Sequence, residues 1–297
     1  MTLVERALIP TSVECLTSHR AMLGEGPIWD WRRDRLIWVD ILGGDTLVLQ
    51  GAKGVFEAVR PKSPLTSIGL AAEGGYVATT YRSFCMLDED LGIASSLPDT
   101  EPDLPGNRFN DGKVDPLGRF WSGTMDCDIV RVSGALYRFD GGDVRRLDDG
   151  YGITNGPAFS LDGRIAYHTD TAIGKIYAFD LDNQGEIITK RQFIVLPEGV
   201  GKPDGMTIDR AGRLYVAHFG GARISRWLAD GSYDGRIDLP ARNVTSLCFG
   251  GPAFDTIFAT TASIEDAGNP LAGAAFRIRL DAIGRREPLF IASPGRD

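Results

Sequence analysis

Three oxygen-bearing side chains, Glu25, Asn155 and Asp204, each stand directly before a glycine at the start of a short apolar segment. Two carboxylates and one amide oxygen suit a hard divalent cation such as Ca²⁺, Mg²⁺ or Mn²⁺. Because the amide is neutral, a bound cation would keep enough positive charge to polarise a carbonyl group. Asn110-Asp111-Gly112 has the same arrangement, and Asp170 adds a carboxylate nearby. This pattern predicts a metal centre made of oxygen ligands.

A second interpretation is that Asp or Asn before Gly is ordinary turn chemistry. Four copies at equivalent positions, one of them containing a Glu, favour a shared site. Arg108 is the cation beside this cluster. Its planar guanidinium could hold a sugar hydroxyl or a carboxylate, or it could pair with an acid in segment 96–104. The spacing leaves both roles open.

Other chemistries find less support in the sequence. Neither a G-x-S-x-G nor an S-x-x-K nucleophile motif is present, and Gly24-Glu25-Gly26 lacks the rest of a dinucleotide fingerprint. His168 and His218 occupy similar positions in different repeats, so they could form a paired base or could simply pack. The four cysteines form no C-x-x-C pair and are expected to be buried, reduced thiols.

The elements that must position these residues are short β-hairpins. Segment 151–171 contains two predicted strands, 156–160 and 165–169, around an Asp-Gly turn. Similar hairpins recur about every 40 to 50 residues with further short strands between them, which is typical of β-propeller blades. We therefore predict an all-β, six-bladed β-propeller that forms a single domain over residues 1–297.

Ring closure and the location of the site follow from this architecture. A strand at about 12–16 should pair with the last blade, which removes an exposed sheet edge. Because blades surround a central channel, Glu25, Asn155 and Asp204 should meet at one mouth of that channel. The metal is therefore expected in the central channel, bound by three different repeats.

Bulk properties limit the possible partners. The chain has 297 residues, of which 43% are hydrophobic, and a net charge of −8. That charge argues against nucleic acid or an anionic membrane as a partner. The N-terminal segment contains Glu5 and Glu14 and lacks an apolar stretch of signal-peptide length. We expect a cytoplasmic, monomeric protein.

Several segments carry a resemblance to a known family. They are GEGPIW at 24–29, RFNDGKVDPLGRFWSGTM at 108–125, ITNGPAFSLDG at 153–163, PDGMTID at 203–209, LP at 239–240 with NVTSLCFGG at 243–251, and LAGAAFRI at 271–278. In order and spacing they resemble the gluconolactonase/regucalcin (senescence-marker-protein) family, and the bacterial sugar-acid lactonases in particular.

The resemblance implies a six-bladed propeller that hydrolyses a sugar (aldono-) lactone to the aldonic acid. It implies one divalent metal (Ca²⁺, Mg²⁺, Mn²⁺, Zn²⁺ or Fe²⁺) held by Glu25, Asn155 and Asp204, Lewis-acid catalysis and direct attack by water. Arg108 and Asn110 would contact the substrate. Asp204 would act as the catalytic base, or the metal would lower the pKa of the attacking water directly. The repeat pattern by itself points to Asp111 rather than to Asn110.

The chain departs from the regucalcin-like pattern in one loop. Regucalcin-like members have a longer loop after the G-T-M strand, which brings a Glu towards the substrate. Here segment 126–133 is short and offers Asp126 and Asp128. Two alternative functions are a non-catalytic calcium- or ligand-binding propeller and a metal-dependent phosphotriester or aryl-ester hydrolase.

Overall fold

The computed structural model describes residues 6–51, 55–266 and 268–292. The predicted domain 1–297 therefore includes a few residues outside the described ranges. The described chain forms β-strands joined by turns. It contains no helix that is long and apolar enough to cross a membrane.

The strands follow one another in six groups. In chain order they are β1 (Ser12–Cys15), β2 (Gly24–Asp30), β3 (Arg35–Asp40), β4 (Asp45–Gln50), β5 (Val55–Val59), β6 (Leu65–Leu70), β7 (Tyr76–Thr80), β8 (Phe84–Leu87), β9 (Ile93–Ser96), β10 (Asn107–Val114), β11 (Phe120–Asp126), β12 (Gly134–Phe139), β13 (Val144–Tyr151), β14 (Thr154–Phe159), β15 (Ile165–Asp170), β16 (Lys175–Leu181), β17 (Ile187–Val195), β18 (Lys202–Ile208), β19 (Leu214–Phe219), β20 (Arg223–Trp227), β21 (Tyr233–Asp238), β22 (Asn243–Gly250), β23 (Thr256–Ala262) and β24 (Phe276–Arg279).

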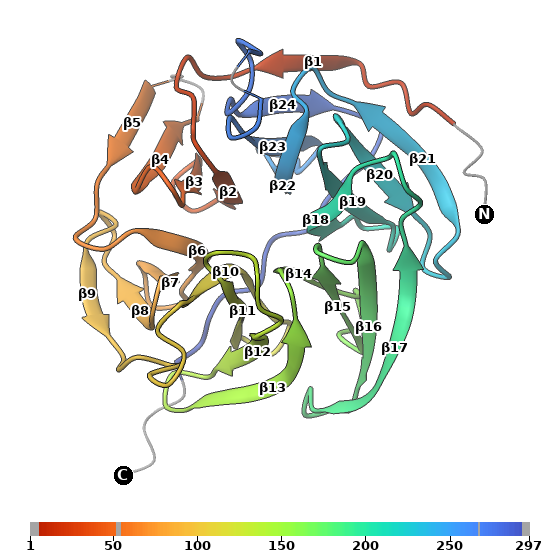
Figure 1. Ribbon diagram of the computed structural model, residues 1–297. Coiled ribbons are helices and arrows are strands. Elements are labelled where there is room, and N and C mark those ends of the chain that lie inside the picture. The colour runs from red at the N-terminus through yellow and green to blue at the C-terminus, as the bar shows by residue number, and fades with distance from the viewer. Residues whose placement is uncertain (1–5, 52–54, 267, 293–297) are drawn as a thin grey trace.

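Six antiparallel, four-stranded sheets are arranged around a common centre, which confirms the six-bladed β-propeller (Figure 1). Five sheets are built from four consecutive strands, starting at β2, β6, β10, β14 and β18. In the sixth, the order is β1-β24-β23-β22, so the N-terminal strand is the outer strand of the last blade. Ser12 pairs with Arg279 and Cys15 with Phe276. The predicted closure of the ring is therefore confirmed.

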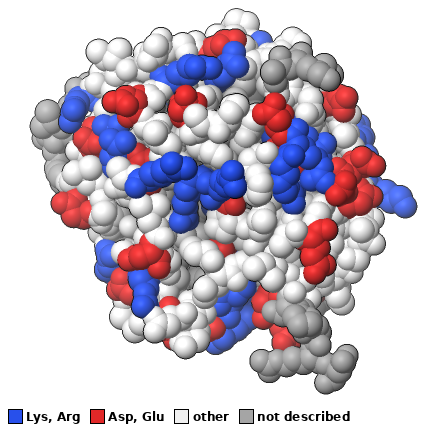
Figure 2. Space-filling view, turned by 180° about the vertical axis from the view of Figure 1, so that it is seen from behind, with Lys and Arg blue, Asp and Glu red and all other residues white. Residues whose placement is uncertain are grey.

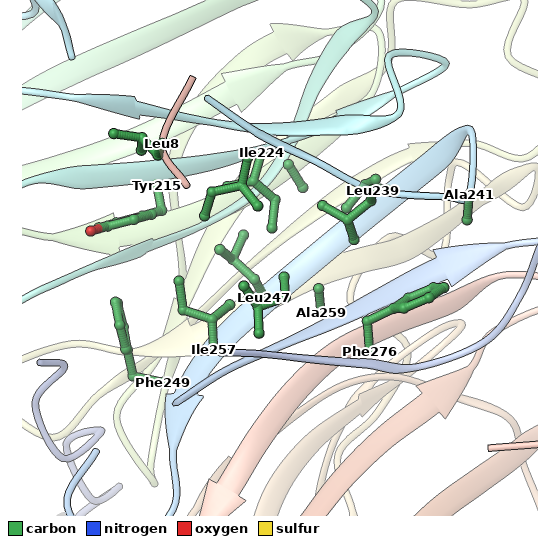
Figure 3. Close-up of a cluster of buried hydrophobic side chains, with 14 of the residues drawn as sticks. Leu8, Tyr215, Ile224, Leu239, Ala241, Leu247, Phe249, Ile257, Ala259 and Phe276 are labelled. Carbon is green, nitrogen blue, oxygen red and sulfur yellow. The ribbon is translucent and has the colours of Figure 1, made fainter. Parts of the chain in front are cut away.

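The apolar core lies between neighbouring blades. In the cluster between the fifth and sixth blades, Tyr215 and Ile224 face Leu247, Ile257 and Phe276 (Figure 3). These side chains alternate along their strands with residues of the opposite face, as sheet geometry requires. Each blade thus depends on both neighbours, and the innermost strands are held at defined positions around the channel.

The segment after β24 crosses the far end of the channel. Within it, Phe290 donates its backbone N–H to the carbonyl of Leu70 at 2.7 Å, and Ile291 donates to Gly118 at 2.8 Å. Glu287 lies beside Lys113, with 3.7 Å between carboxylate and ammonium. Together with Asp111, Lys113 and Glu287 line a small cavity of about 20 Å³. The C-terminal segment therefore covers one end of the channel.

Two further predictions concern cysteines and surface charge. The described cysteines are free, but Cys15 and Cys127 are exposed, so the prediction that all four thiols are buried was wrong. Cys15 belongs to the outermost strand of its blade, and Cys127 follows the end of β11. On the face shown in Figure 2, basic and acidic side chains lie beside one another among the residues drawn in colour.

Candidate metal centre

β-bulges at the start of the innermost strands set the direction of the candidate side chains. In β14, Asn155 pairs with Thr169 and Ala158 with Tyr167, so two residues of β14 stand opposite one residue of β15. The innermost strands of all six blades have a register shift in this region. A bulge bends its strand and redirects the neighbouring side chains. The repeated motif therefore marks a repeated bulge.

The glycine after each ligand candidate has a structural reason. Gly26 and Gly156 have φ values of +50° and +74°, a backbone region that residues other than glycine rarely adopt. Gly205 has no such angle, but a Cβ there would lie 2.2 Å from the hydroxyl of Ser246. Two of the preceding acids also bond the glycine that follows them: Glu25 Oε2 accepts the N–H of Gly26 at 3.0 Å, and Asp111 Oδ1 accepts that of Gly112 at 2.7 Å. The interpretation as local backbone chemistry therefore holds in part.

Glu25, Asp111 and Asp204 form a buried cluster of acids. Glu25 is 2% exposed and Asp204 is 3% exposed. Burial, with the added charges of Asp204 and Asp111, raises the pKa of Glu25 well above its ordinary value. Burial and the charge of Asp111 raise the pKa of Asp204 in the same direction. Adjacent buried carboxylates are costly unless a cation compensates for them.

Two atoms at this cluster are suited to a cation. The Oδ1 atom of Asp204 is buried and has no hydrogen-bond partner. The Oδ1 atom of Asn155 accepts one hydrogen bond, from Asn110 at 2.8 Å, which leaves its second lone pair available. No group of three His, Cys, Asp or Glu side chains in the described ranges is arranged to hold a metal. A site here would therefore need the amide of Asn155 beside Glu25 and Asp204, as the sequence predicted, and these residues fit a hard cation.

Asp111 belongs to this acid cluster but has a different role from Glu25 and Asp204. One of its oxygens accepts the N–H of Gly112 at 2.7 Å, and the other accepts the N–H of Gly156 at 3.1 Å. Burial raises the pKa of Asp111 to about 6. Because both oxygens are used by backbone donors, Asp111 ties the bulge of β10 to the bulge of β14. Asp170 accepts three backbone N–H groups in the same manner, at 3.2 to 3.3 Å.

Arg108 and Asn110 adjoin the acids in a buried pair. The Arg108 guanidinium donates to Asn110 Oδ1 at 2.7 Å and to the carbonyl of Phe109 at 2.9 Å. Burial lowers the pKa of Arg108, while the charge of Glu25 opposes that change. Among the described residues, no ion pair joins Arg108 to an acid of segment 96–104: Asp99 pairs with Arg82 at 2.8 Å, and Glu101 accepts hydrogen bonds from other side chains. Arg108 therefore belongs to the channel.

All five predicted site residues, Glu25, Arg108, Asn110, Asn155 and Asp204, line one cavity of about 150 Å³. Its other lining residues are largely apolar: Leu23, Met125, Ile129, Ile153, Phe219 and Ile264, with Thr171 and Glu265. The cavity thus combines a charged, hydrogen-bonding floor with an apolar rim. Such a site can hold a small polar ligand through a few directed contacts.

The short loop 126–133 contributes differently from the two acids predicted there. Asp126 accepts hydrogen bonds from the Arg131 side chain at 2.6 Å and from backbone N–H groups, which hold its pKa well below the ordinary value. Asp128 is exposed, and Ile129 is the loop residue that lines the cavity. Glu265, from the loop after β23, is the acid at the rim, and the sequence pattern carried no signal for it.

The two histidines are packing residues. His218 contacts the carbonyl of Val200 and the hydroxyl of Ser225, both at 2.7 Å, and burial lowers its pKa to about 4. His168 lies edge-on to Tyr151 with 4.7 Å between ring centroids, and burial lowers its pKa to about 3. The paired-base interpretation is therefore wrong, because neither imidazole lines the cavity.

The sequence of this chain is similar to a known family and to named proteins. Residues 23–263 match the SMP-30/Gluconolactonase/LRE-like region. The chain is 34% identical over 286 residues to a 6-deoxy-6-sulfogluconolactonase of Pseudomonas putida, covering 94% of this chain and 98% of that protein. It is also 34% identical to a pentonolactonase of Haloferax volcanii over 89% of this chain and 93% of that one.

A solved structure supports the architecture independently. The calcium-binding protein regucalcin of Agrobacterium tumefaciens superposes with a TM-score of 0.89 at 26% identity. The superposition covers 96% of this chain and 99% of that one. The likeness extends over the whole propeller, including the blades that carry the acidic cluster.

Proposed function

The chain belongs to the SMP-30/Gluconolactonase/LRE-like family, and from this premise we propose that its channel cavity hydrolyses a sugar (aldono-) lactone to the aldonic acid. The observation that carries the proposal is the convergence of Glu25, Asn155 and Asp204 with Arg108 and Asn110 on one small cavity. The named lactonases among its relatives support the substrate class.

One divalent cation would be held by Glu25, Asn155 and Asp204. When bound, it would supply Lewis-acid polarisation of a lactone carbonyl and stabilise the negative charge that develops on its oxygen. The all-oxygen donor set favours Ca²⁺, Mg²⁺ or Mn²⁺ over metals that prefer nitrogen or sulfur ligands. A bound cation would also neutralise the buried negative charge of the two carboxylates.

The residues of the chain bind the sugar and handle the proton. Arg108 holds hydroxyl groups of the substrate through its guanidinium. Both amide N–H groups of Asn110 bond to Thr154 and Asn155, so Asn110 meets the substrate through its carbonyl oxygen, while the apolar lining contacts the C–H surfaces. Asp204 accepts the proton from the attacking water through the carboxylate oxygen that is less engaged with the cation. Among the described residues that line the cavity there is neither Ser nor Cys, which supports direct attack of water on the carbonyl.

We further propose that the enzyme is a cytoplasmic monomer that works as one domain. Its substrate is a small molecule, with neither nucleic acid nor membrane as partner. The net charge of −8 and the mixture of charges on the face in Figure 2 support this proposal.

A substrate panel tests the function and separates it from the alternatives. We expect pentono- and hexonolactones to be hydrolysed in a pH-stat assay, and we expect EDTA to abolish the activity because it removes the Lewis acid. Paraoxon and phenyl acetate serve as phosphotriester and aryl-ester comparisons. Hydrolysis of those two without lactone turnover would contradict the proposal. Calcium binding without any hydrolysis would instead identify a binding propeller.

A further inference from the structure

A continuous chain of buried hydrogen bonds links the two amides of the site to a neighbouring blade. Arg108 donates to Asn110 Oδ1 at 2.7 Å, and Asn110 Nδ2 donates to Asn155 Oδ1 at 2.8 Å. Asn155 Nδ2 donates to the hydroxyl of Thr171 at 2.8 Å. That hydroxyl donates in turn to the carbonyl of Pro203 at 2.7 Å. This series of hydrogen bonds thus runs from the Arg108 guanidinium in the third blade to the backbone carbonyl of Pro203 in the fifth blade.

The chemistry of its two ends determines its direction. A guanidinium can only donate, and a backbone carbonyl can only accept. The single hydroxyl proton of Thr171 is therefore used on Pro203, so the Thr171 oxygen must accept from Asn155. The NH₂ group of Asn155 then faces Thr171, and its carbonyl oxygen faces Asn110 and the channel. The hydrogen bonds therefore determine which end of each carboxamide is the oxygen and which is the nitrogen, so each amide has a single orientation.

The hydroxyl of Thr171 also connects two of the proposed ligands. It bonds the side chain of Asn155 and the carbonyl of Pro203, the residue directly before Asp204. Asn155 is 3% exposed and Thr171 is 7% exposed, so water cannot readily replace a lost partner. Without the hydroxyl, the NH₂ group of Asn155 loses its acceptor, and the bond from Asn110 alone holds the amide oxygen towards the place where a cation would sit.

We propose that Thr171 is a positioning residue for the metal: it locks the Asn155 carboxamide with its oxygen towards Glu25 and Asp204 and ties that ligand to the strand that carries Asp204. This inference rests on the proposed function for the existence of the metal centre. It goes beyond that function because part of the affinity for the cation is assigned to the Thr171 hydroxyl, which is not itself a ligand.

Thr171→Val tests the proposal, because valine keeps the shape of threonine and lacks the hydroxyl. We expect the Kd for Mn²⁺, measured by calorimetry on metal-free protein, to rise by about 10- to 100-fold, as is common when a group that orients a ligand is lost. Thr171→Ser restores the hydroxyl and should bind within about twofold of wild type, by the same reasoning. Thr171→Ala makes the same test if the valine variant does not fold.

Thr261→Val is the matched control. The Thr261 hydroxyl is buried and donates to the carbonyl of Ala274 at 2.7 Å, a bond of the same kind that does not involve Asn155. We expect its Mn²⁺ affinity to equal that of wild type. Folded Thr171→Val with wild-type affinity, or Thr171→Ser weakened as much as Thr171→Val, would overturn the role of Thr171.

The readout also separates this proposal from the lactonase proposal. It measures metal binding alone, so a failure to hydrolyse lactones would refute the enzyme activity and leave the role of Thr171 standing. If wild-type protein bound no Mn²⁺, both the metal centre and the role of Thr171 would be refuted.

Discussion

Asp204→Asn is expected to reduce lactone hydrolysis by on the order of 10³-fold, the loss that follows when the main electrostatic stabilisation of a transition state is removed. The substitution takes away a ligand carboxylate and the proposed proton acceptor in one step. The same change should raise the thermal midpoint of the metal-free protein. Asp204 Oδ1 makes no hydrogen bond, so the native carboxylate carries a desolvation cost that the single backbone N–H of Gly205 offsets only in part.

This combination of lost activity and gained stability is checked by parallel assays and thermal melts. Asp209→Asn is the matched control from the same blade. Asp209 is also fully buried, but it accepts hydrogen bonds from Arg213 at 2.6 Å and from backbone N–H groups. We expect this control to lose stability and keep its metal. A stability loss in Asp204→Asn equal to that of Asp209→Asn would show that Asp204 is a structural acid.

Removal of residues 1–16 is expected to have the second large effect, because it deletes β1. The deletion exposes the edge of β24 and removes the contacts of Leu8 and Leu16 with two core clusters. Burial of two leucines contributes about 4 kcal/mol, which corresponds to a fall in the thermal midpoint of about 10 °C for a chain of this size. Because Glu25 follows directly in the first blade, Mn²⁺ affinity should fall as well.

Glu14→Gln provides the comparison for this truncation. It removes only the exposed ion pair between Glu14 and Arg277, at 2.7 Å, and should change stability by less than about 1 kcal/mol. Calorimetric melts and Mn²⁺ titrations of both proteins would measure the difference. A truncated chain that melts like wild type would mean that β1 does not close the ring.

The sequence could predict the blades because the residues that specify each hairpin lie close together in the sequence. An Asp-Gly turn and alternating apolar residues lie within each hairpin, as at 154–170, and the repeat of that unit indicated a ring. Ring geometry then brings Glu25, Asn155 and Asp204 together although they are distant in the sequence. The family resemblance pointed to Asn110 rather than Asp111 and gave Arg108 a substrate-binding role, which its position in the sequence had left open.

The remaining features depend on contacts between segments. The bulge in β10 places Asn110 and Asp111 opposite a single residue of β11, so simple strand alternation cannot tell which of them faces the cavity. The C-terminal segment binds several blades through its backbone, which leaves no side-chain pattern to recognise. The role of Thr171 depends on a carbonyl 32 residues away in another blade.

The central claim is that one cation at Glu25, Asn155 and Asp204 is required for lactone hydrolysis. The direct measurement is a titration of metal-free protein with Mn²⁺, in which bound metal and initial rate on an aldonolactone are recorded at each addition. The account predicts that activity starts at background, rises in proportion to bound metal and stops rising at one equivalent per chain. Full activity before any metal is added would contradict it, and so would activity that is unrelated to the metal bound.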